Sequence, residues 1–284
     1  MAILLAPLVA LGLLAGCSET LETPTIEVEG PPLTEPTITY AAPFEISSTS
    51  SRVVVEGNGE RVRSDKPVLI HYRLESAQSG EVIDQTFGAL PKTYLLTPED
   101  MSLELYEALV GVHVGSRVLL LTAGDDELGT IPTVLVADVL PTEATGAPVE
   151  PRPDLPVVVV DEEGVPQVEI PQSDPPEELE VQTLVRGSGA QVSGQSTVVV
   201  QYTMVRWRDS MVVDSTWEAL GPRSFSLAEA ITGWTLGLAE QTVGSRVLLV
   251  VPPATAVDEE SNDLTRETVV YVVDILAATT PEED

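Results

Sequence analysis

Apolar residues form short runs along most of the chain, and turn-forming residues separate these runs. The runs are rich in Val, Ile and Leu, which favour β-strands, and they are bounded by Gly, Pro, Asp and Ser. One short segment has helical spacing instead, because Ile231, Trp234 and Leu238 lie at positions i, i+3 and i+7 and so share one face. The pattern predicts several strands and few helices. The clearest strand runs are residues 69–72, 118–121, 136–140, 199–202, 247–251 and 272–276.

These runs belong to a repeat of about 130 residues. The eight residues from Val114 recur almost letter for letter from Val243, and both runs open with Val-Gly-Ser-Arg. Three further pairs of motifs follow the same order, and only the last pair is displaced, by six residues, so a longer loop is expected between residues 253 and 269. Four ordered matches at a nearly constant offset indicate a tandem duplication. The other pairs are residues 69–72 with 199–202, 82–86 with 212–216 and 136–140 with 272–276.

Each repeat is predicted to be an α+β unit in which one short helix packs on an antiparallel sheet. The sequence Thr97-Pro98-Glu99-Asp100 resembles a capping box with proline at the first helical position, which predicts a helix start in the first unit. The Ser-x-x-Glu pattern from Ser226 to Glu229 predicts the corresponding start in the second. We place the two units at residues 51–142 and 181–279.

Residues 1–17 are predicted to be a lipoprotein signal peptide. Their apolar run is too short to span a bilayer comfortably, and Leu14-Ala15-Gly16-Cys17 resembles the bacterial lipobox, in which the cysteine is acylated. No Lys or Arg precedes the apolar run, and an ordinary secretory signal with an incidental cysteine is the alternative. We expect lipidation at Cys17, export, and attachment to the outer face of the cytoplasmic membrane through the lipid anchor.

The remaining segments contain many Pro, Thr, Ser and Glu residues. Residues 18–50 have no apolar period and are expected to form a solvated, extended tether. Residues 143–180 are predicted to be an acidic, proline-rich linker, although the apolar runs 155–160 and 165–170 could be short strands that pack against one unit. Residues 280–284 form a tail.

Composition excludes several classes of function. The net charge is −31, and no cluster of Lys and Arg occurs, so nucleic acid is not an expected partner. The chain has one cysteine and two histidines, without metal-ligand spacing, so neither a metal nor a cofactor is expected. Gly187-Ser188-Gly189 lacks the third glycine of a dinucleotide loop and is interpreted as a turn.

The second unit resembles the FKBP-type peptidyl-prolyl cis/trans isomerases, and the whole chain resembles a two-domain actinobacterial lipoprotein of that family. The resemblance covers residues 184–277. It depends on the order and spacing of several individually weak motifs. They are Gly187-Ser188-Gly189, Val200-Gln201-Tyr202, Val213-Asp214-Ser215-Thr216, Phe225-Ser226-Leu227, Ile231-Thr232-Gly233-Trp234, Val243-Gly244-Ser245-Arg246, Pro252-Pro253 and residues 270–276.

The resemblance implies two half-wrapped sheets, each around one helix, with an apolar proline-binding pocket in the second unit. It implies that Trp234 is the pocket floor and that the Ile231 backbone amide receives a substrate carbonyl. Its other implied site residues are Tyr202, Phe225 and Tyr271 as walls and Asp214 as the polar group beside Tyr202. From the residues alone, Trp234 would more often be a core residue than a pocket floor, and Asp214 would usually be a turn cap.

The rim of this pocket departs from the family pattern. Val213 stands where the family has an aromatic residue before the aspartate, and Arg223 replaces an aromatic ahead of Phe225. Ala230 is smaller than the usual residue, and Val257 stands near the position of the usual outer-loop tyrosine.

The first unit departs from the pattern more strongly. It keeps Tyr72, Asp84 and Tyr94, but it has Leu105 at the tryptophan position, and its outer loop, residues 125–129, is shorter. We therefore predict that the first unit is a degenerate copy.

Three functions remain open at this stage. The first is a surface-anchored prolyl isomerase that acts on proline-containing unfolded or exported polypeptides and accepts macrolide pocket ligands. The second is a non-catalytic chaperone or assembly factor that uses the same pocket. The third is an acidic surface spacer.

Overall fold

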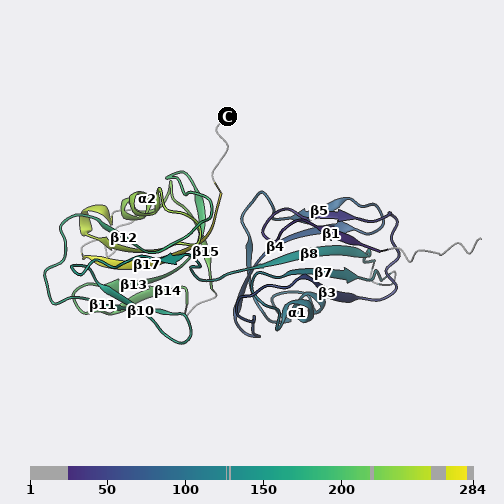
Figure 1. The fold of residues 1–284 in the computed structure, drawn as a ribbon, viewed down its shortest axis with the longest axis horizontal. Helices are drawn as coiled ribbons and strands as arrows, with labels where there is room; N and C mark the ends of the chain where they lie inside the picture. The colour runs from purple at the N-terminus through teal and green to yellow at the C-terminus, as the bar shows by residue number, and fades with distance from the viewer. Residues whose placement is uncertain (1–24, 126, 128, 218–220, 257–266, 280–284) are drawn as a thin grey trace, which may run out of the picture.

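The computed structural model describes residues 25–279, except residues 126, 128, 218–220 and 257–266. Two lobes lie side by side along its long axis, and each lobe contains one large sheet, one two-stranded hairpin and one short α-helix (Figure 1). The described strands pair in antiparallel fashion, so the predicted α+β class is confirmed. Cys17 and the predicted signal peptide lie outside the described residues, as does the tail. No helix among the described residues is long and apolar enough to cross a membrane.

The first sheet has the strand order β3-β7-β8-β4-β5, and β6 also pairs with β4. Helix α1 (Leu103–Leu109) packs against β7. The strands are β3 (Ser50–Val55), β4 (Pro67–Ser76), β5 (Val82–Gln85), β6 (Lys92–Leu95), β7 (Arg117–Thr122) and β8 (Thr133–Leu140).

The second sheet repeats this order as β12-β16-β17-β13-β14, with β15 paired to β13 and the short β9 (Ala147–Pro148) added beside β12. Helix α2 (Thr232–Leu238) packs against β16, and a 3-10 turn, η1 (Pro253–Thr255), follows that strand. The strands are β12 (Glu180–Arg186), β13 (Thr197–Arg206), β14 (Val212–Ser215), β15 (Arg223–Ser226), β16 (Arg246–Val251) and β17 (Val269–Thr279).

The central strands are apolar at nearly every position because both faces of each sheet are covered. In β16, Val247 and Leu249 pack toward α2, whereas Leu248 and Val250 belong to a separate cluster on the opposite face. Since side chains alternate along a strand, a strand buried on one face only would alternate apolar and polar residues. The continuous apolar run therefore required a second covering layer.

That layer is a β-hairpin on the outer face of each sheet. The hairpin of the first lobe lies in the segment that was predicted to be a solvated tether. In the first lobe the hairpin consists of β1 (Glu27–Glu29) and β2 (Thr37–Thr39), and Ile26 is buried against β7 and β8. Residues 25–50 are therefore not a solvated tether. Their apolar residues were missed because they are spaced among Thr, Pro and Glu on one face of short strands only.

The predicted extended linker, residues 143–180, contains the matching hairpin of the second lobe. It consists of β10 (Val157–Val160) and β11 (Pro166–Glu169), and the neighbouring Leu155 is 3% exposed. The alternative of short packed strands was therefore the right one. Proline is tolerated because the hairpin is a separate two-stranded sheet without a central strand.

The two hairpins extend the repeat beyond the predicted boundaries. Val28 pairs with Ile38 in the first hairpin, and Val158 pairs with Val168 in the second, so both partners are shifted by the same 130 residues. The two lobes differ in the large side chain that fills the space between the hairpin and the sheet. Phe44 packs over Ala77 in the first lobe, whereas in the second the sheet itself supplies Trp207 at the position equivalent to Ala77. The duplicated unit thus comprises a hairpin, a sheet and a helix.

The repeated Val-Gly-Ser-Arg motif has a structural role in both lobes. Gly244 adopts φ +91°, a left-handed conformation that glycine accommodates without strain, and the Ser245 hydroxyl accepts the Gly187 N–H at 2.9 Å. Arg246 donates to both carboxylate oxygens of Asp274, at 2.6 and 2.7 Å. The first lobe builds the same buried ion pair between Arg117 and Asp138.

Both helices start later than the capping-box patterns predicted, so those two predictions are wrong. The N-cap of α1 is Ser102, whose hydroxyl accepts the Leu105 N–H at 3.3 Å. The segment after Thr97 is a turn in which the Asp100 carboxylate accepts the Leu95 N–H. In the second lobe the Ser226 carbonyl accepts the Glu229 N–H in a turn. A Ser/Thr-x-x-acidic sequence suits a tight turn as well as a helix start.

The two lobes meet through equivalent apolar residues. Leu69 and its counterpart Val199 lie in one buried cluster, as do Leu140 and its counterpart Leu276. The Thr93 hydroxyl donates to the Pro222 carbonyl at 3.1 Å across the junction. Because equivalent surfaces of the two copies face each other, the junction resembles a self-complementary interface between two copies.

Candidate functional site

Four aromatic side chains converge at the N-terminal end of α2. Trp234 comes from the helix, and Tyr202 and Tyr271 come from the neighbouring strands β13 and β17. Phe225 comes from β15, where it pairs with Val198 of β13. The Trp234 ring centroid lies 5.4 Å from that of Tyr202, 5.1 Å from Phe225 and 5.4 Å from Tyr271, all edge to face. This is the favourable geometry for aromatic pairs, so the rings hold one another in place.

The Tyr202 hydroxyl donates a short hydrogen bond to the Asp214 carboxylate. Burial raises the pKa of Tyr202, and the bond to Asp214 raises it further, so the phenol stays protonated at neutral pH. Asp214 itself is exposed on β14, opposite Met204 of β13. The strand pairing thus brings together the two polar groups that the family resemblance had associated.

Ile231 occupies the N-cap position of α2 and does not cap the helix with its side chain. Its carbonyl accepts the N–H groups of Trp234 and Thr235, at 2.9 and 3.1 Å. Within the described residues, no acceptor is found for the Ile231 N–H. A helix N-terminus carries unsatisfied donors and a partial positive charge, so this end of α2 suits a carbonyl oxygen.

Of the predicted rim residues, Val213 and Ala230 are partly buried and pack against the same cluster. Val257 and the acidic residues that follow it lie outside the described residues. All six predicted site residues therefore lie in or beside one cluster, together with two of the three rim residues. The cluster comprises Tyr202, Asp214, Phe225, Ile231, Trp234 and Tyr271.

Trp234 is 5% exposed, and its indole N–H has no hydrogen-bond partner among the described residues. Leaving a buried donor unpaired costs about 1–3 kcal/mol, so an apolar residue would fill this place more favourably if packing were its only role. The first lobe has such a residue, since Leu105 occupies the same third position of α1, where it is partly buried and packs against the core.

The equivalent cluster of the first lobe contains a lysine that sequence reasoning missed. Tyr72 donates to Asp84 at 2.5 Å, as Tyr202 does to Asp214. Lys92 donates to the Tyr72 oxygen at 2.5 Å, bonds Asp84 at 3.2 Å and lies over the Tyr72 ring. Burial raises the pKa of Tyr72 to about 12, and the bond to Asp84 adds to the rise. The tyrosine–aspartate pair of the first lobe is therefore engaged by a side chain of the same lobe.

The residue that corresponds to Lys92 in the second lobe is Arg223. Lys92 pairs with Ile70 across β6 and β4, and Arg223 pairs with Val200 across β15 and β13. The sequence does contain a signal for this lysine, because both repeats have a basic residue at this position. The match becomes visible only when the strand pairing is known.

A family model described as FKBP-type peptidyl-prolyl cis-trans isomerase matches residues 189–276. A probable FK506-binding protein of Corynebacterium glutamicum is 31% identical over 115 residues, which cover 40% of this chain and 98% of the relative. The chain belongs to the FKBP-type peptidyl-prolyl cis-trans isomerase family. Membership supports isomerase activity, and the matched segment contains all six predicted site residues.

Other FKBP proteins are also similar to this chain. An FK506-binding protein of Streptomyces anulatus is 28% identical over 118 residues, covering 39% of this chain and 95% of the relative. Among solved structures, a putative FKBP isomerase of Mycobacterium tuberculosis is 30% identical, covers 40% of this chain and 94% of its own, and has a TM-score of 0.30. The three FKBP domains of a wheat protein cover 82% of this chain at 16% identity, with a TM-score of 0.33.

Proposed function

We propose that the second lobe, residues 181–279, is a prolyl isomerase that acts on exported polypeptides. The observation that carries the proposal is the aromatic cluster around Trp234, which lies beside the Ile231 N–H, a donor without an acceptor in the part of the chain that the structure describes. Such a site grips a proline ring by its apolar faces and can offer one hydrogen bond to the carbonyl before it.

The chemistry requires no nucleophile. Rotation about the peptide bond has a barrier of about 18–20 kcal/mol because it breaks amide resonance. A site accelerates it by binding the twisted amide more tightly than the planar one. Among aromatic side chains the carbonyl is removed from water, which disfavours the more polar resonance form of the planar amide.

The test is a protease-coupled assay of the full chain on a Xaa-Pro tetrapeptide at low temperature. Trp234→Leu, which installs the first-lobe residue, is expected to lower kcat/KM at least about tenfold because the aromatic floor is lost. Trp207→Leu is the matched control, since it makes the same change to a buried tryptophan on the opposite face of the same sheet. A wild-type chain at the background rate, or a folded Trp234→Leu variant at the wild-type rate, would contradict the proposal.

A non-catalytic role in binding proline-containing segments is the second candidate. It is favoured by the rim, where Arg223, Val213 and Ala230 replace the usual residues. This role predicts suppression of aggregation of an unfolded client without measurable isomerisation, and the suppression would survive Trp234→Leu.

The first lobe is proposed to be an FKBP-like copy without activity. Its support is the shared strand order and the engagement of Tyr72 and Asp84 by Lys92. If Trp234→Leu reduces the rate to background, the first lobe contributes no activity. A residual rate that is abolished by a further Tyr72→Phe substitution would show that it does.

Attachment to the outer face of the cytoplasmic membrane through Cys17 is proposed from the sequence motif alone. Labelled palmitate should be incorporated by the wild-type chain and not by Cys17→Ala. Absence of label from the wild-type chain would contradict lipidation.

A further inference from the structure

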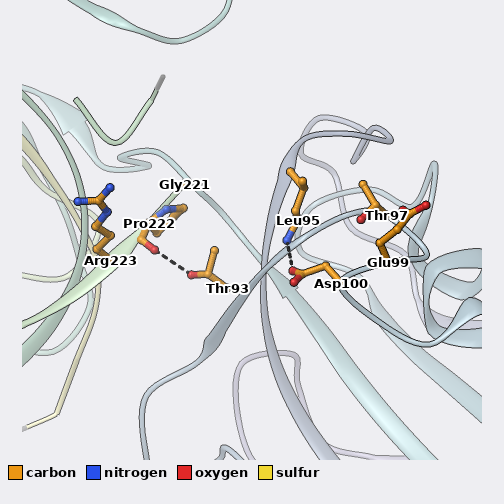
Figure 2. A pocket seen from close by; sticks show the side chains of 8 residues that line it. All are labelled: Thr93, Leu95, Thr97, Glu99, Asp100, Gly221, Pro222 and Arg223. Atoms are coloured by element: carbon orange, nitrogen blue, oxygen red, sulfur yellow. Dashed lines mark hydrogen bonds between the residues drawn. The ribbon is translucent and has the colours of Figure 1, made fainter. Parts of the chain in front are cut away.

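A cleft of about 550 Å³ lies between the lobes, at the edge of the candidate site (Figure 2). Its second-lobe wall is formed by residues 221–223 at the start of β15, and its first-lobe wall is β6 with the turn that follows it. Binding sites of this size are common at domain interfaces. The lining residues are Thr93, Leu95, Thr97, Glu99, Asp100, Gly221, Pro222 and Arg223.

The junction between the lobes is closely packed beside the cleft, and this packing fixes the two walls of the cleft relative to each other. The Thr93 hydroxyl bonds the Pro222 carbonyl, as the dashed line in Figure 2 shows. A Cβ on Gly221 would lie 2.4 Å from the Pro67 side chain, which leaves no room for a larger residue there. The shape of the cleft is therefore determined by the packing of the two lobes against each other.

Arg223 belongs to both the cleft and the candidate site. It lies two residues before Phe225 on β15, and the alternation of side chains along a strand places both on the same face. Its positive charge also acts to lower the pKa of Tyr202, against the larger raising effect of burial. A polypeptide chain whose proline lies among the aromatic rings would thus pass over Arg223 to enter the cleft.

The two ends of the cleft carry opposite charges that are available to a ligand. Arg223 is exposed, and no ion pair or hydrogen bond engages its guanidinium among the described residues, whereas the equivalent Lys92 is bound within its own lobe. Glu99, on the opposite wall, is exposed and has no partner in the same part of the chain. Asp100 is engaged by the Leu95 N–H at 2.7 Å.

We propose that this cleft binds the segment of a client polypeptide that flanks its proline. An acidic client residue pairs with Arg223 near the proline, and a basic client residue further along pairs with Glu99. The inference rests on the proposed isomerase function, because the client's proline must first occupy the aromatic site. It gives the first lobe a role in selecting clients without any catalysis of its own.

The test compares short and extended substrates of the full-length chain. One substrate is the Xaa-Pro tetrapeptide, and the others extend it by several residues on the N-terminal or the C-terminal side, with Lys at the end of the extension. Glu99→Lys should leave kcat/KM of the tetrapeptide unchanged and lower that of one extended peptide about fivefold, because an attraction becomes a repulsion at an exposed site. The matched control is Glu107→Lys, an exposed change on α1 outside the cleft.

Reversing the charge of the peptide in the Glu99→Lys variant tests whether the effect comes from a direct pairing of charges. Replacing the terminal Lys of the responding peptide by Glu should restore kcat/KM in Glu99→Lys, which a merely structural effect of the substitution would not do. Equal rates for wild type and Glu99→Lys on both extended peptides would overturn the proposal while the tetrapeptide rate still supports the isomerase. Absence of any tetrapeptide isomerisation by the wild type would instead contradict the proposed function itself.

Discussion

The two lobes have the same strand order, the same outer hairpin and the same buried ion pair, yet their candidate sites differ. In the second lobe, Trp234 packs against three other aromatic rings, and the Arg223 side chain at the edge has no ion-pair partner among the described residues. In the first, Leu105 replaces the tryptophan, and Lys92 is bound to Tyr72 and Asp84. The scaffold therefore tolerates either set of residues. This comparison separates the residues that build the fold from those that build the site.

The largest expected effect concerns a feature that both lobes share. Asp138→Ala and Asp274→Ala each leave a buried arginine without its carboxylate partner, which should lower the free energy of unfolding by about 3–5 kcal/mol. Hydrogen exchange of each lobe during urea unfolding would measure the loss separately. Asp154→Ala, which breaks an exposed ion pair with Arg152, is the control and should change little. If only one of the two variants loses stability, the buried ion pair is not required for the stability of both lobes.

The second-largest expected effect concerns the large side chain that packs beneath each hairpin, Trp207 in the second lobe and Phe44 in the first. Trp207→Leu should destabilise the second lobe by about 1–3 kcal/mol because it leaves a cavity beneath the hairpin and removes the bond to the Ser173 carbonyl. All three tryptophans lie in the second lobe, so fluorescence of the remaining two reports its unfolding. Phe44→Leu is the counterpart in the first lobe and should leave that fluorescence transition unchanged.

A smaller effect tests whether the tyrosine–aspartate bond serves the same purpose in both lobes. Tyr202→Phe removes the hydroxyl that donates to Asp214 and should lower kcat/KM for the tetrapeptide about tenfold, the size expected for a hydrogen bond to a charged group. Tyr72→Phe removes the equivalent group and should leave kcat/KM unchanged. Equal losses in the two variants would contradict the assignment of activity to the second lobe alone.

The smallest effect is a pH dependence of the first lobe. Burial lowers the pKa of His71, which stacks on Phe87, whereas the second lobe has Gln201 at the equivalent position. Because the folded state favours the neutral ring, its contribution to stability is complete above the unfolded pKa of about 6.5 and is lost as the pH falls below it. His71→Gln should reduce the pH dependence of first-lobe stability between pH 7 and 5, measured by hydrogen exchange. An unchanged slope would exclude His71 as its cause.

Most of the sheet could be predicted from the sequence because the duplication gave an internal comparison. The six candidate site residues were predicted from the family resemblance, and the structure brings them together in or beside one cluster. Strand runs, the Val-Gly-Ser-Arg turn and the position of Leu105 opposite Trp234 follow from alignment of the two copies. The hairpins were not recognised, because residues 25–50 and 143–180 contain many prolines and acidic residues and bury only one face of short strands. The helix starts were misplaced because the same short patterns also form turns.

By itself, the sequence determined the repeat, the main strand runs of the two large sheets and the family, since these depend on residue type and spacing along the chain. The tertiary structure decided which charged side chains are engaged. Lys92 and Arg223 have nearly the same local context, but only Lys92 meets its own Tyr72 and Asp84. The cleft beside Arg223 likewise exists only where two segments far apart in the chain meet. Ion pairs and clefts depend on distances between segments far apart in the chain, and no local pattern determines those distances.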